Sequence, residues 1–187
     1  MILIKKLLKW CFNILRLIFL KIKFREKLEV KIFCKKPVYV GKHCSIDISR
    51  NGKIVLAEGV YIDDYSSLKA DGGLISIAKN SYMNTFCKIV SKEYIEIGEN
   101  NIFGSNVSIY DHDHDFSKGV KNSLESFVTA KIILKDDIWL CTNVVVTKGV
   151  TLENNIVCAC NSVITKDLES NSLYGGIPAQ RIKHVMN

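Results

Sequence analysis

A six-residue period in the hydrophobic residues constrains the fold of this chain more than any other feature. From position 134 onward an apolar residue recurs every six positions, and a second small or apolar position follows four residues after each. The first row is Leu134, Leu140, Val146, Leu152, Cys158 and Ile164, and the second is Ile138, Val144, Val150, Ile156, Ser162 and Leu168. Neither the helical period nor strand alternation produces this spacing. It predicts an all-β solenoid, in which short parallel strands stack coil on coil and identical positions form buried rows.

The same spacing recurs in shorter runs earlier in the chain, and the longest break between runs follows Ile109. The earlier members are Val40 and Ile46; Leu56, Ile62 and Leu68; Ile77, Met83 and Ile89; and Ile97, Phe103 and Ile109. Ile109 and Leu134 are 25 positions apart, which is not a multiple of six, so the chain must leave the solenoid between about residues 110 and 131. A polar excursion on a rigid scaffold is where functional residues are most often found.

Charge and cysteine content argue against several other classes of protein. Residues 1–36 hold 11 Lys/Arg and 2 Asp/Glu, a local charge of +9, whereas the other 151 residues sum to −2. The basic segment lacks the placement and aromatic interleaving of a nucleic-acid site, so we expect no nucleic-acid partner. Seven cysteines without a CxxC pair, in a chain without a secretory signal, indicate reduced thiols and a cytoplasmic protein.

Residues 1–28 are predicted to form a basic amphipathic helix, followed by a basic connector up to residue 36. Apolar side chains fill a wide face of this helix. The opposite face holds Lys5, Lys9, Asn13 and Arg16 at helical spacing. The longest uncharged stretch, residues 10–15, is too short to span a bilayer. A helix in the membrane interface, with its cations over anionic lipid, fits this pattern, and so does a helix packed on the body or on a neighbouring subunit.

The excursion contains a cluster of histidines suited to acid–base chemistry. His112 and His114 alternate with Asp111, Asp113 and Asp115, and an extended backbone points the two imidazoles to one side. An imidazole that titrates near neutrality can take the proton of a hydroxyl, as acyl transfer to an alcohol requires. Two other interpretations stay open: a zinc site built on the HxH pair, which lacks a third histidine at a plausible spacing, and a solvated loop without chemistry.

The repeat register, together with three stretches of sequence, resembles the left-handed β-helix acyltransferases. These stretches are WLCTNVVVTKGVTLENN from residue 139, VITKD from residue 163 and GGIPAQRIK from residue 175. The resemblance is to the galactoside, maltose and polysaccharide O-acetyltransferase branch and covers roughly residues 38–183. It implies a left-handed parallel β-helix of hexapeptide repeats over residues 37–169, with a short C-terminal tail over 170–187. It also implies acetyl-CoA as donor, no required metal, and a homotrimer with active sites between neighbouring subunits.

The resemblance assigns roles to individual residues. His112 matches the catalytic histidine, with His114 as the alternative. Two roles stay open for Asp113 and Asp115, which either orient the ring or solvate the loop. Asn84 matches an asparagine near the reacting centre, although an asparagine also suits a left-handed solenoid corner. The residues matched to the donor or its surroundings are Trp139, Thr142 and Cys160 along the groove, Thr165 and Lys166 near the adenosine end, and Arg181 and Lys183 at the phosphates. Arg181 stands one place after Gln180, which replaces the family's arginine.

The sequence therefore predicts an acetyl-CoA-dependent O-acetyltransferase that acetylates a saccharide hydroxyl, with His112 as general base and direct attack on the thioester. The basic helix points to a surface-polysaccharide or lipid-linked glycan precursor as carbohydrate acceptor. It also points to a peripheral position on the cytoplasmic face of an anionic membrane, through residues 1–28. The alternatives are an N-acetyltransferase acting on an amino-sugar nucleotide, a zinc-dependent hydratase and a non-catalytic solenoid module.

Overall fold

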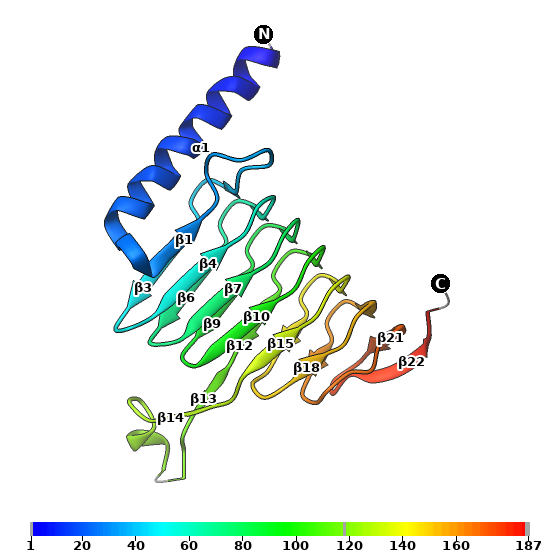
Figure 1. Cartoon of the computed structure of the whole chain (residues 1–187). Coiled ribbons are helices and arrows are strands. Elements are labelled where there is room, and N and C mark those ends of the chain that lie inside the picture. The colour runs from blue at the N-terminus through cyan, green and yellow to red at the C-terminus, as the bar shows by residue number, and fades with distance from the viewer. Residues whose placement is uncertain (1, 118, 186–187) are drawn as a thin grey trace.

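The computed structural model describes residues 2–117 and 119–185, with the side chains of residues 2–9 and of Asn122 excepted. The description thus leaves out the side chains of the predicted cations Lys5 and Lys9. It also leaves out the last two residues of the predicted tail. A long helix, α1 (Ile2–Phe24), and a short 3₁₀ helix, η1 (Arg25–Lys27), precede a solenoid of short strands (Figure 1).

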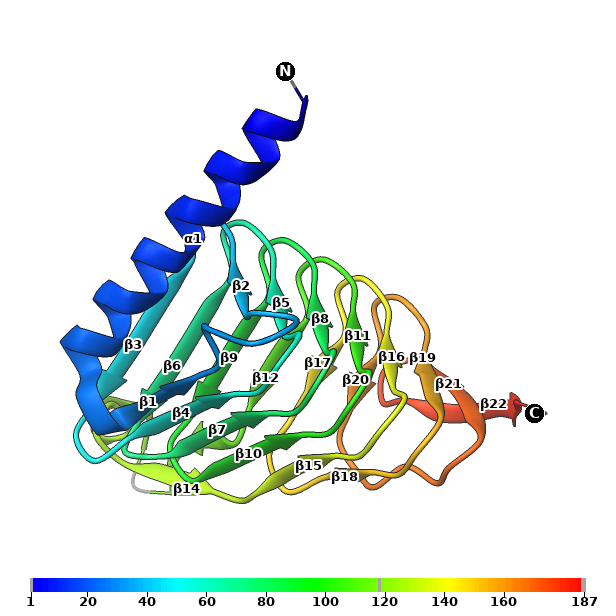
Figure 2. The same ribbon diagram turned by 45° about the horizontal axis from the view of Figure 1, so that its top comes forward.

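Three sheets form the walls of the solenoid, and successive coils add parallel strands to them (Figures 1 and 2). The last strand of sheet B is the exception, since it pairs antiparallel with the strand before it. Sheet A consists of β1 (Leu28–Val30), β4 (Lys53–Leu56), β7 (Leu74–Ile77), β10 (Tyr94–Ile97), β15 (Ile132–Leu134) and β18 (Thr151–Leu152). Sheet B consists of β2 (Tyr39–Val40), β5 (Tyr61–Ile62), β8 (Tyr82–Met83), β11 (Ile102–Phe103), β16 (Trp139–Leu140), β19 (Ile156–Cys158), β21 (Ser172–Gly175) and β22 (Gln180–His184). Sheet C consists of β3 (Ser45–Ser49), β6 (Ser67–Asp71), β9 (Lys88–Ser91), β12 (Ser108–Tyr110), β17 (Val145–Val146) and β20 (Val163–Ile164).

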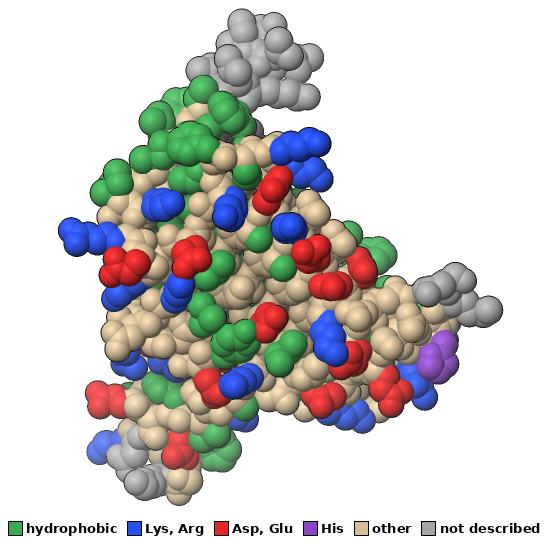
Figure 3. Space-filling view, in the orientation of Figure 1, with side chains coloured by type: hydrophobic (Ala, Val, Ile, Leu, Met, Phe, Trp, Pro, Cys, Tyr) green, Lys and Arg blue, Asp and Glu red, His purple; other side chains and the backbone are tan. Residues whose placement is uncertain are grey.

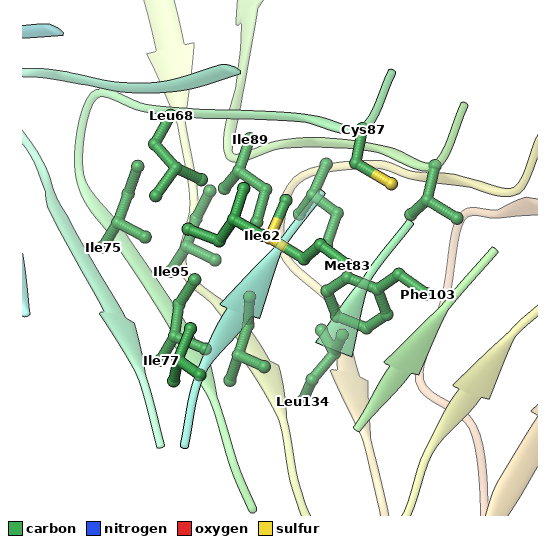
Figure 4. Packing of buried hydrophobic residues seen from close by; sticks show 14 of the residues in the cluster. Ile62, Leu68, Ile75, Ile77, Met83, Cys87, Ile89, Ile95, Phe103 and Leu134 are labelled. Atoms are coloured by element: carbon green, nitrogen blue, oxygen red, sulfur yellow. The ribbon is translucent and has the colours of Figure 1, made fainter. Parts of the chain in front are cut away.

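The interior of the solenoid is filled by the residues that the six-residue period selects (Figure 4). Every member of the predicted rows is buried, and the most exposed of them, Ile46 in the first coil, has 8% of its surface accessible. Burial of each large aliphatic side chain contributes about 1.5–3 kcal/mol relative to leaving it in water. The solenoid prediction is therefore confirmed, and the rows supply its core.

The corners between sheets turn through residues with left-handed backbone. Most of these residues are asparagines, which tolerate positive φ better than other side chains: Asn80, Asn100, Asn106, Asn143, Asn155, Asn161 and Asn171. Their amides also bond from coil to coil, as Asn143 Nδ2 donates to Asn161 Oδ1 at 3.0 Å. The polar residues between the apolar rows thus define the corners and join successive coils.

Helix α1 covers the open end of the first coil (Figure 2), and it does so with its polar side. Buried Asn13 donates through Nδ2 to the carbonyl of Val38 at 2.8 Å and accepts through Oδ1 from the N–H of Val40 at 2.9 Å. The Arg16 guanidinium donates to the backbone carbonyls of Val40, Gly41 and Cys44. The solenoid begins here, so no earlier strand can hydrogen-bond to these backbone groups. The side chains of Asn13 and Arg16 take that place.

The helix therefore packs on the body, and the face on which we expected cations over lipid is turned partly toward the solenoid. Leu17 and Leu20 of the same side enter the core. The side turned away from the solenoid is apolar. No helix in the described part of the chain is long and apolar enough to cross a bilayer.

The sheets extend beyond both ends of the range 37–169. Strand β1 falls in the predicted connector and pairs with β4, and β21 falls in the predicted tail and pairs with β19. The repeat pattern alone could not place these strands, since an eight-residue loop separates β1 from the rest and no regular coil follows β21.

Candidate active site

The excursion folds as a small antiparallel hairpin at the edge where sheet C passes to sheet A (Figure 1). Its strands are β13 (His112–His114) and β14 (Phe127–Thr129), and a 3₁₀ turn, η2 (Val120–Asn122), lies between them. The imidazoles of His112 and His114 both contact the ring of Phe127, at centroid distances of 5.6 and 4.6 Å. The two histidines therefore lie on one side of the hairpin, as the alternation predicted.

Asp111, which the sequence analysis did not select, holds His112 in place. Its side chain is fully buried and accepts five hydrogen bonds. Oδ2 accepts from Ser91 Oγ at 2.7 Å and from the N–H groups of Glu93 and Tyr94 at 2.9 Å. Oδ1 accepts from the N–H of Lys92 at 2.8 Å and lies 3.1 Å from His112 Nδ1. The missed signal was the alternation of β12, which turns Asp111 inward two places after Ile109.

The surroundings of the two histidines differ in a way that bears on catalysis. A proton on His112 Nδ1, donated to the carboxylate of Asp111, leaves Nε2 free to accept a proton. His114 Nδ1 lies 2.8 Å from the carbonyl oxygen of Ser123, so it must be the donor and fastens the two sides of the excursion together. The two aspartates considered for orienting the ring bond elsewhere: Asp113 pairs with Lys148 at 2.7 Å, and Asp115 accepts from the N–H of Ser117. The carboxylate that is bonded to His112 is that of Asp111.

His112 opens onto a cleft of about 680 Å³ between the excursion and the outer face of sheet C. Its other lining residues are Arg50, Lys69, Asp71, Val90, Lys92, Leu124, Glu125 and Phe127. Lys92 Nζ lies 2.6 Å from Asp71 Oδ2 and 3.8 Å from the centroid of the Phe127 ring. The hydrogen bond from Lys92 lowers the pKa of Asp71 below its ordinary value. The Lys92 side chain thus joins the excursion to the solenoid beside His112.

Four residues predicted for the site line a second groove, of about 410 Å³, at the edge where sheet B passes to sheet C. They are Asn84, Trp139, Thr142 and Cys160, and their neighbours are Tyr82, Ile102, Phe103, Gly104 and Cys141. Burial raises the pKa of the Cys141 thiol, so it is a neutral wall of this groove. Asn84 does not have the left-handed backbone that a solenoid corner requires, because the left-handed residue at this corner is Phe86, with φ 62°. The side chain of Asn84 instead accepts from the N–H of Thr85 at 2.7 Å.

The predicted residues near the end of the chain lie at the last coils and do not line this groove. Lys166 Nζ donates to Gln180 Oε1 at 3.3 Å, which brings the VITKD stretch against the tail. Arg181 pairs with Glu169 at 2.8 Å, so its charge already has a partner. Thr165 and Lys183 are exposed, Lys183 on β22 opposite Leu173.

One chain does not bring the histidine and the groove together. Asn84, Thr142 and Cys160 come just before the sheet C strands of their coils, whereas His112 comes just after β12. The two clefts are therefore separated by the length of those strands, about 10–17 Å. Each cleft contains only part of the set of residues predicted for the reaction.

Comparison with known proteins agrees with this architecture, although no protein-family profile matches the chain. The sequence is 26% identical over 173 residues, 85% of each chain, to WbbJ of Escherichia coli K12, provisionally named a lipopolysaccharide biosynthesis O-acetyl transferase. It is 28% identical over 114 residues to the galactoside O-acetyltransferase of the same organism, covering 61% of this chain and 56% of that one.

Solved structures show the same fold. AntD of Bacillus cereus, an N-acyltransferase determined as a mutant in complex with dTDP and coenzyme A, superposes with a TM-score of 0.70 at 21% identity, over 88% of this chain and 87% of AntD. A maltose O-acetyltransferase of Clostridium difficile 630 gives 0.55 at 24% identity, over 79% and 70% of the two chains.

The fold is the left-handed β-helix of the solved hexapeptide-repeat acyltransferases, and the names of the sequence relatives support an acyltransferase enzyme. Within that class its sequence is similar to O-acetyltransferases, so the resemblance stated from the repeats and the closing motif is confirmed.

Proposed function

We propose that the protein transfers the acetyl group of acetyl-CoA to a hydroxyl of a saccharide. The observation that carries this proposal is the His112–Asp111 pair, an imidazole bonded to a fully buried carboxylate and open to a cleft large enough for a sugar. The O-acetyltransferase names of the sequence relatives support the same reaction.

His112 acts as general base in this mechanism. Nε2 takes the proton of the acceptor hydroxyl while its oxygen attacks the thioester carbonyl carbon. Asp111 fixes the tautomer and stabilises the imidazolium that forms. The oxyanion accepts hydrogen bonds from backbone N–H groups and from the Asn84 amide of a neighbouring subunit. When the carbon–sulfur bond breaks, the thiolate of coenzyme A leaves and the imidazolium returns a proton to it.

The groove lined by Asn84, Trp139, Thr142 and Cys160 suits the donor. It crosses several coils, is walled by small and apolar side chains, and offers corner backbone groups to an extended pantetheine arm. Lys166 and Lys183 are the cations we assign to the phosphates, because Arg181 is already paired with Glu169. Calorimetric titration of acetyl-CoA tests this site, and a Lys166→Ala/Lys183→Ala variant should bind the donor more weakly. Unchanged affinity in that variant would contradict the assignment.

A homotrimer explains why the two clefts lie at opposite edges of sheet C. In such an assembly His112 of one subunit meets the donor groove of its neighbour, so each active site takes residues from two chains. Mixing two inactive variants, His112→Ala and Asn84→Ala, should restore part of the activity, since some interfaces then receive both intact residues. Activity that stays absent after subunit exchange would contradict a shared site.

The outward side of α1 is the membrane contact that we propose. Phe12, Leu15, Phe19 and Ile22 form one stripe with 64–70% of their surfaces exposed, and Lys21 and Lys23 lie in the last turn. Figure 3 shows hydrophobic side chains gathered along the helix. A stripe of this kind inserts into the interfacial region of a bilayer while nearby cations attract anionic headgroups. The protein would then lie on the cytoplasmic face, close to precursors of surface polysaccharides.

The acceptor decides between O-acetylation and the alternative, N-acetylation of an amino-sugar nucleotide, which the fold likeness to AntD keeps in view. A matched pair of acceptors, one sugar with a hydroxyl and its amino counterpart, should show release of coenzyme A with the hydroxyl form. The His112→Ala variant should lose that activity and a His114→Ala variant should retain more of it. Preference for the amino sugar would favour the alternative.

The mechanism assigns no step to a metal. Among the residues that the structure describes, no group of three or more His, Cys, Asp or Glu side chains is placed to hold an ion. The absence of a metal requirement stays a prediction, and activity that falls on chelation and returns with zinc would contradict it.

A further inference from the structure

A line of cations joins the end of α1 to His112 along one edge of sheet C. Lys27 Nζ donates to the carbonyl of Arg50 at 2.7 Å, and Arg50 Nε lies 3.3 Å from Asp71 Oδ1. Lys92 bonds the other oxygen of the same carboxylate. The strand register aligns Ser49 with Asp71, and its continuation aligns Asp71 with Lys92 and then with His112. These residues therefore occupy the same edge in consecutive coils.

Positive charge is in excess in this part of the cleft. Asp71 accepts from Ser49 Oγ as well as from Arg50 and Lys92, so both of its oxygens are already engaged. Lys69 lies on the outer face of β6, in register with Asp47, and has no ion pair within the described residues. Glu125 of the excursion is the second carboxylate of the lining. Arg50 keeps its terminal nitrogens available, since its ion pair uses Nε.

The spacing along this edge suits an acceptor with a charged group next to its sugar. Arg50 lies three coils from His112, which is about 14 Å at the usual separation of neighbouring strands. A sugar whose hydroxyl meets His112 would place the group at its far end beside Arg50 and Lys69. Arginine and lysine together are the side chains that bind phosphate, the first through its fork of N–H donors and the second as a compact charge.

We propose that Arg50 and Lys69 form a subsite for a diphosphate that links the acceptor sugar to its carrier. The inference rests on the proposed O-acetyltransferase function and specifies its acceptor as a sugar diphosphate. The carrier is a lipid, because the line of cations continues to Lys27 in η1, directly after α1, and α1 bears the exposed apolar stripe that we propose as the membrane contact. A nucleoside diphosphate shares the recognised chemistry, and the test separates the two carriers.

The test uses the full chain and inorganic pyrophosphate as the probe in calorimetric titrations. Saturable binding is expected, weakened about tenfold or more in an Arg50→Gln/Lys69→Gln variant. The matched control is Lys79→Gln/Lys88→Gln, which removes the same charge from two exposed lysines outside the cleft. Absence of binding, or equal weakening in both variants, would overturn the subsite. Thermal unfolding of both variants checks that the fold is retained.

Titration with acetyl-CoA distinguishes a failure of this subsite from a failure of the proposed function. Both variants should bind acetyl-CoA as the wild type does, and acetyl-CoA should not displace pyrophosphate. Displacement would assign the pyrophosphate to the donor site and refute the subsite while leaving the acetyltransferase intact. Loss of acetyl-CoA binding in the wild type would instead remove the proposed function itself.

Two further ligands identify the carrier. The wild type should bind phosphatidylcholine vesicles that contain farnesyl diphosphate more tightly than control vesicles in which phosphatidylglycerol supplies the same negative charge. That preference should disappear in Arg50→Gln/Lys69→Gln. Tighter binding of uridine diphosphate than of inorganic pyrophosphate, without a vesicle preference, would refute the lipid carrier and assign the subsite to a nucleotide.

Discussion

Replacement of Asp111 by asparagine should inactivate His112 by moving one proton. An amide nitrogen at the Oδ2 position would face the N–H groups of Glu93 and Tyr94, whereas at the Oδ1 position it faces only that of Lys92. The second orientation leaves fewer donors unpaired, so asparagine should adopt it. Its amide then donates to His112 Nδ1, and the imidazole proton moves to Nε2, where the base must be free.

The expected losses can be worked from these contacts. One buried N–H without an acceptor costs about 1–3 kcal/mol of folding free energy, and the remaining bonds weaken when the charge is removed. Loss of the general base lowers the acetyl-transfer rate by about 10²–10⁴-fold. Asp113→Asn is the control on the same hairpin, because it removes an exposed ion pair with Lys148 and should change stability by less than about 1 kcal/mol.

The assay follows coenzyme A release with a thiol reagent, and nitrogen NMR of the imidazole reports the tautomer. We expect Asp111→Asn to be folded, to carry its proton on Nε2 of His112 and to be nearly inactive, while Asp113→Asn retains the wild-type rate. A folded Asp111→Asn protein with Nε2 protonated and an unchanged rate would refute the role of His112 as base.

Three other predictions concern the cap, the thiols and the ion pair beside the cleft. Asn13→Ala leaves the carbonyl of Val38 and the N–H of Val40 unpaired, so urea denaturation should show a loss of about 2–5 kcal/mol, against less than about 0.5 kcal/mol for exposed Phe12→Ala. At pH 8, iodoacetamide should modify exposed Cys160 but spare Cys87 and Cys158, because burial raises the pKa values of these two thiols to about 11 and about 12. Saturating acetyl-CoA should protect Cys160 from the reagent. Equal labelling of Cys160 with and without the donor would contradict its place in the groove. The lowered pKa of Asp71 means that its stabilising effect is present above its ordinary value of 3.8 and is lost as the pH falls through the lower folded value. The difference in unfolding free energy between wild type and Asp71→Asn should therefore shrink only in acid, and a difference that also shrinks between pH 7 and pH 5 would contradict the ion pair.

The sequence predicts the body of this fold because one physical requirement repeats along it. Each coil must bury its apolar residues against the next, so Leu134, Leu140 and Val146 lie in the core for the same reason. The same repetition brings Thr142 and Cys160 together, since they hold equivalent corner positions one coil apart. The excursion has no such repeat, and its contacts depend on the surface that it meets. His112 could be selected by its chemistry, but its bond to Asp111 follows from the inward turn of a single carboxylate.

The orientation of α1 shows what an amphipathic pattern cannot determine by itself. A helix with one polar and one apolar face usually buries the apolar one, and the sequence offers no direct reason to expect otherwise. The first coil reverses that preference, because its backbone needs hydrogen-bond partners that Asn13 and Arg16 supply. The cap and the proposed membrane contact thus use different residues of one helix. Deleting residues 1–28 would remove both and uncover the core, whereas Phe12→Ser/Leu15→Ser/Phe19→Ser removes only the exposed stripe. That variant should stay folded and leave anionic vesicles, and continued binding at wild-type affinity would show that the stripe is not the membrane contact.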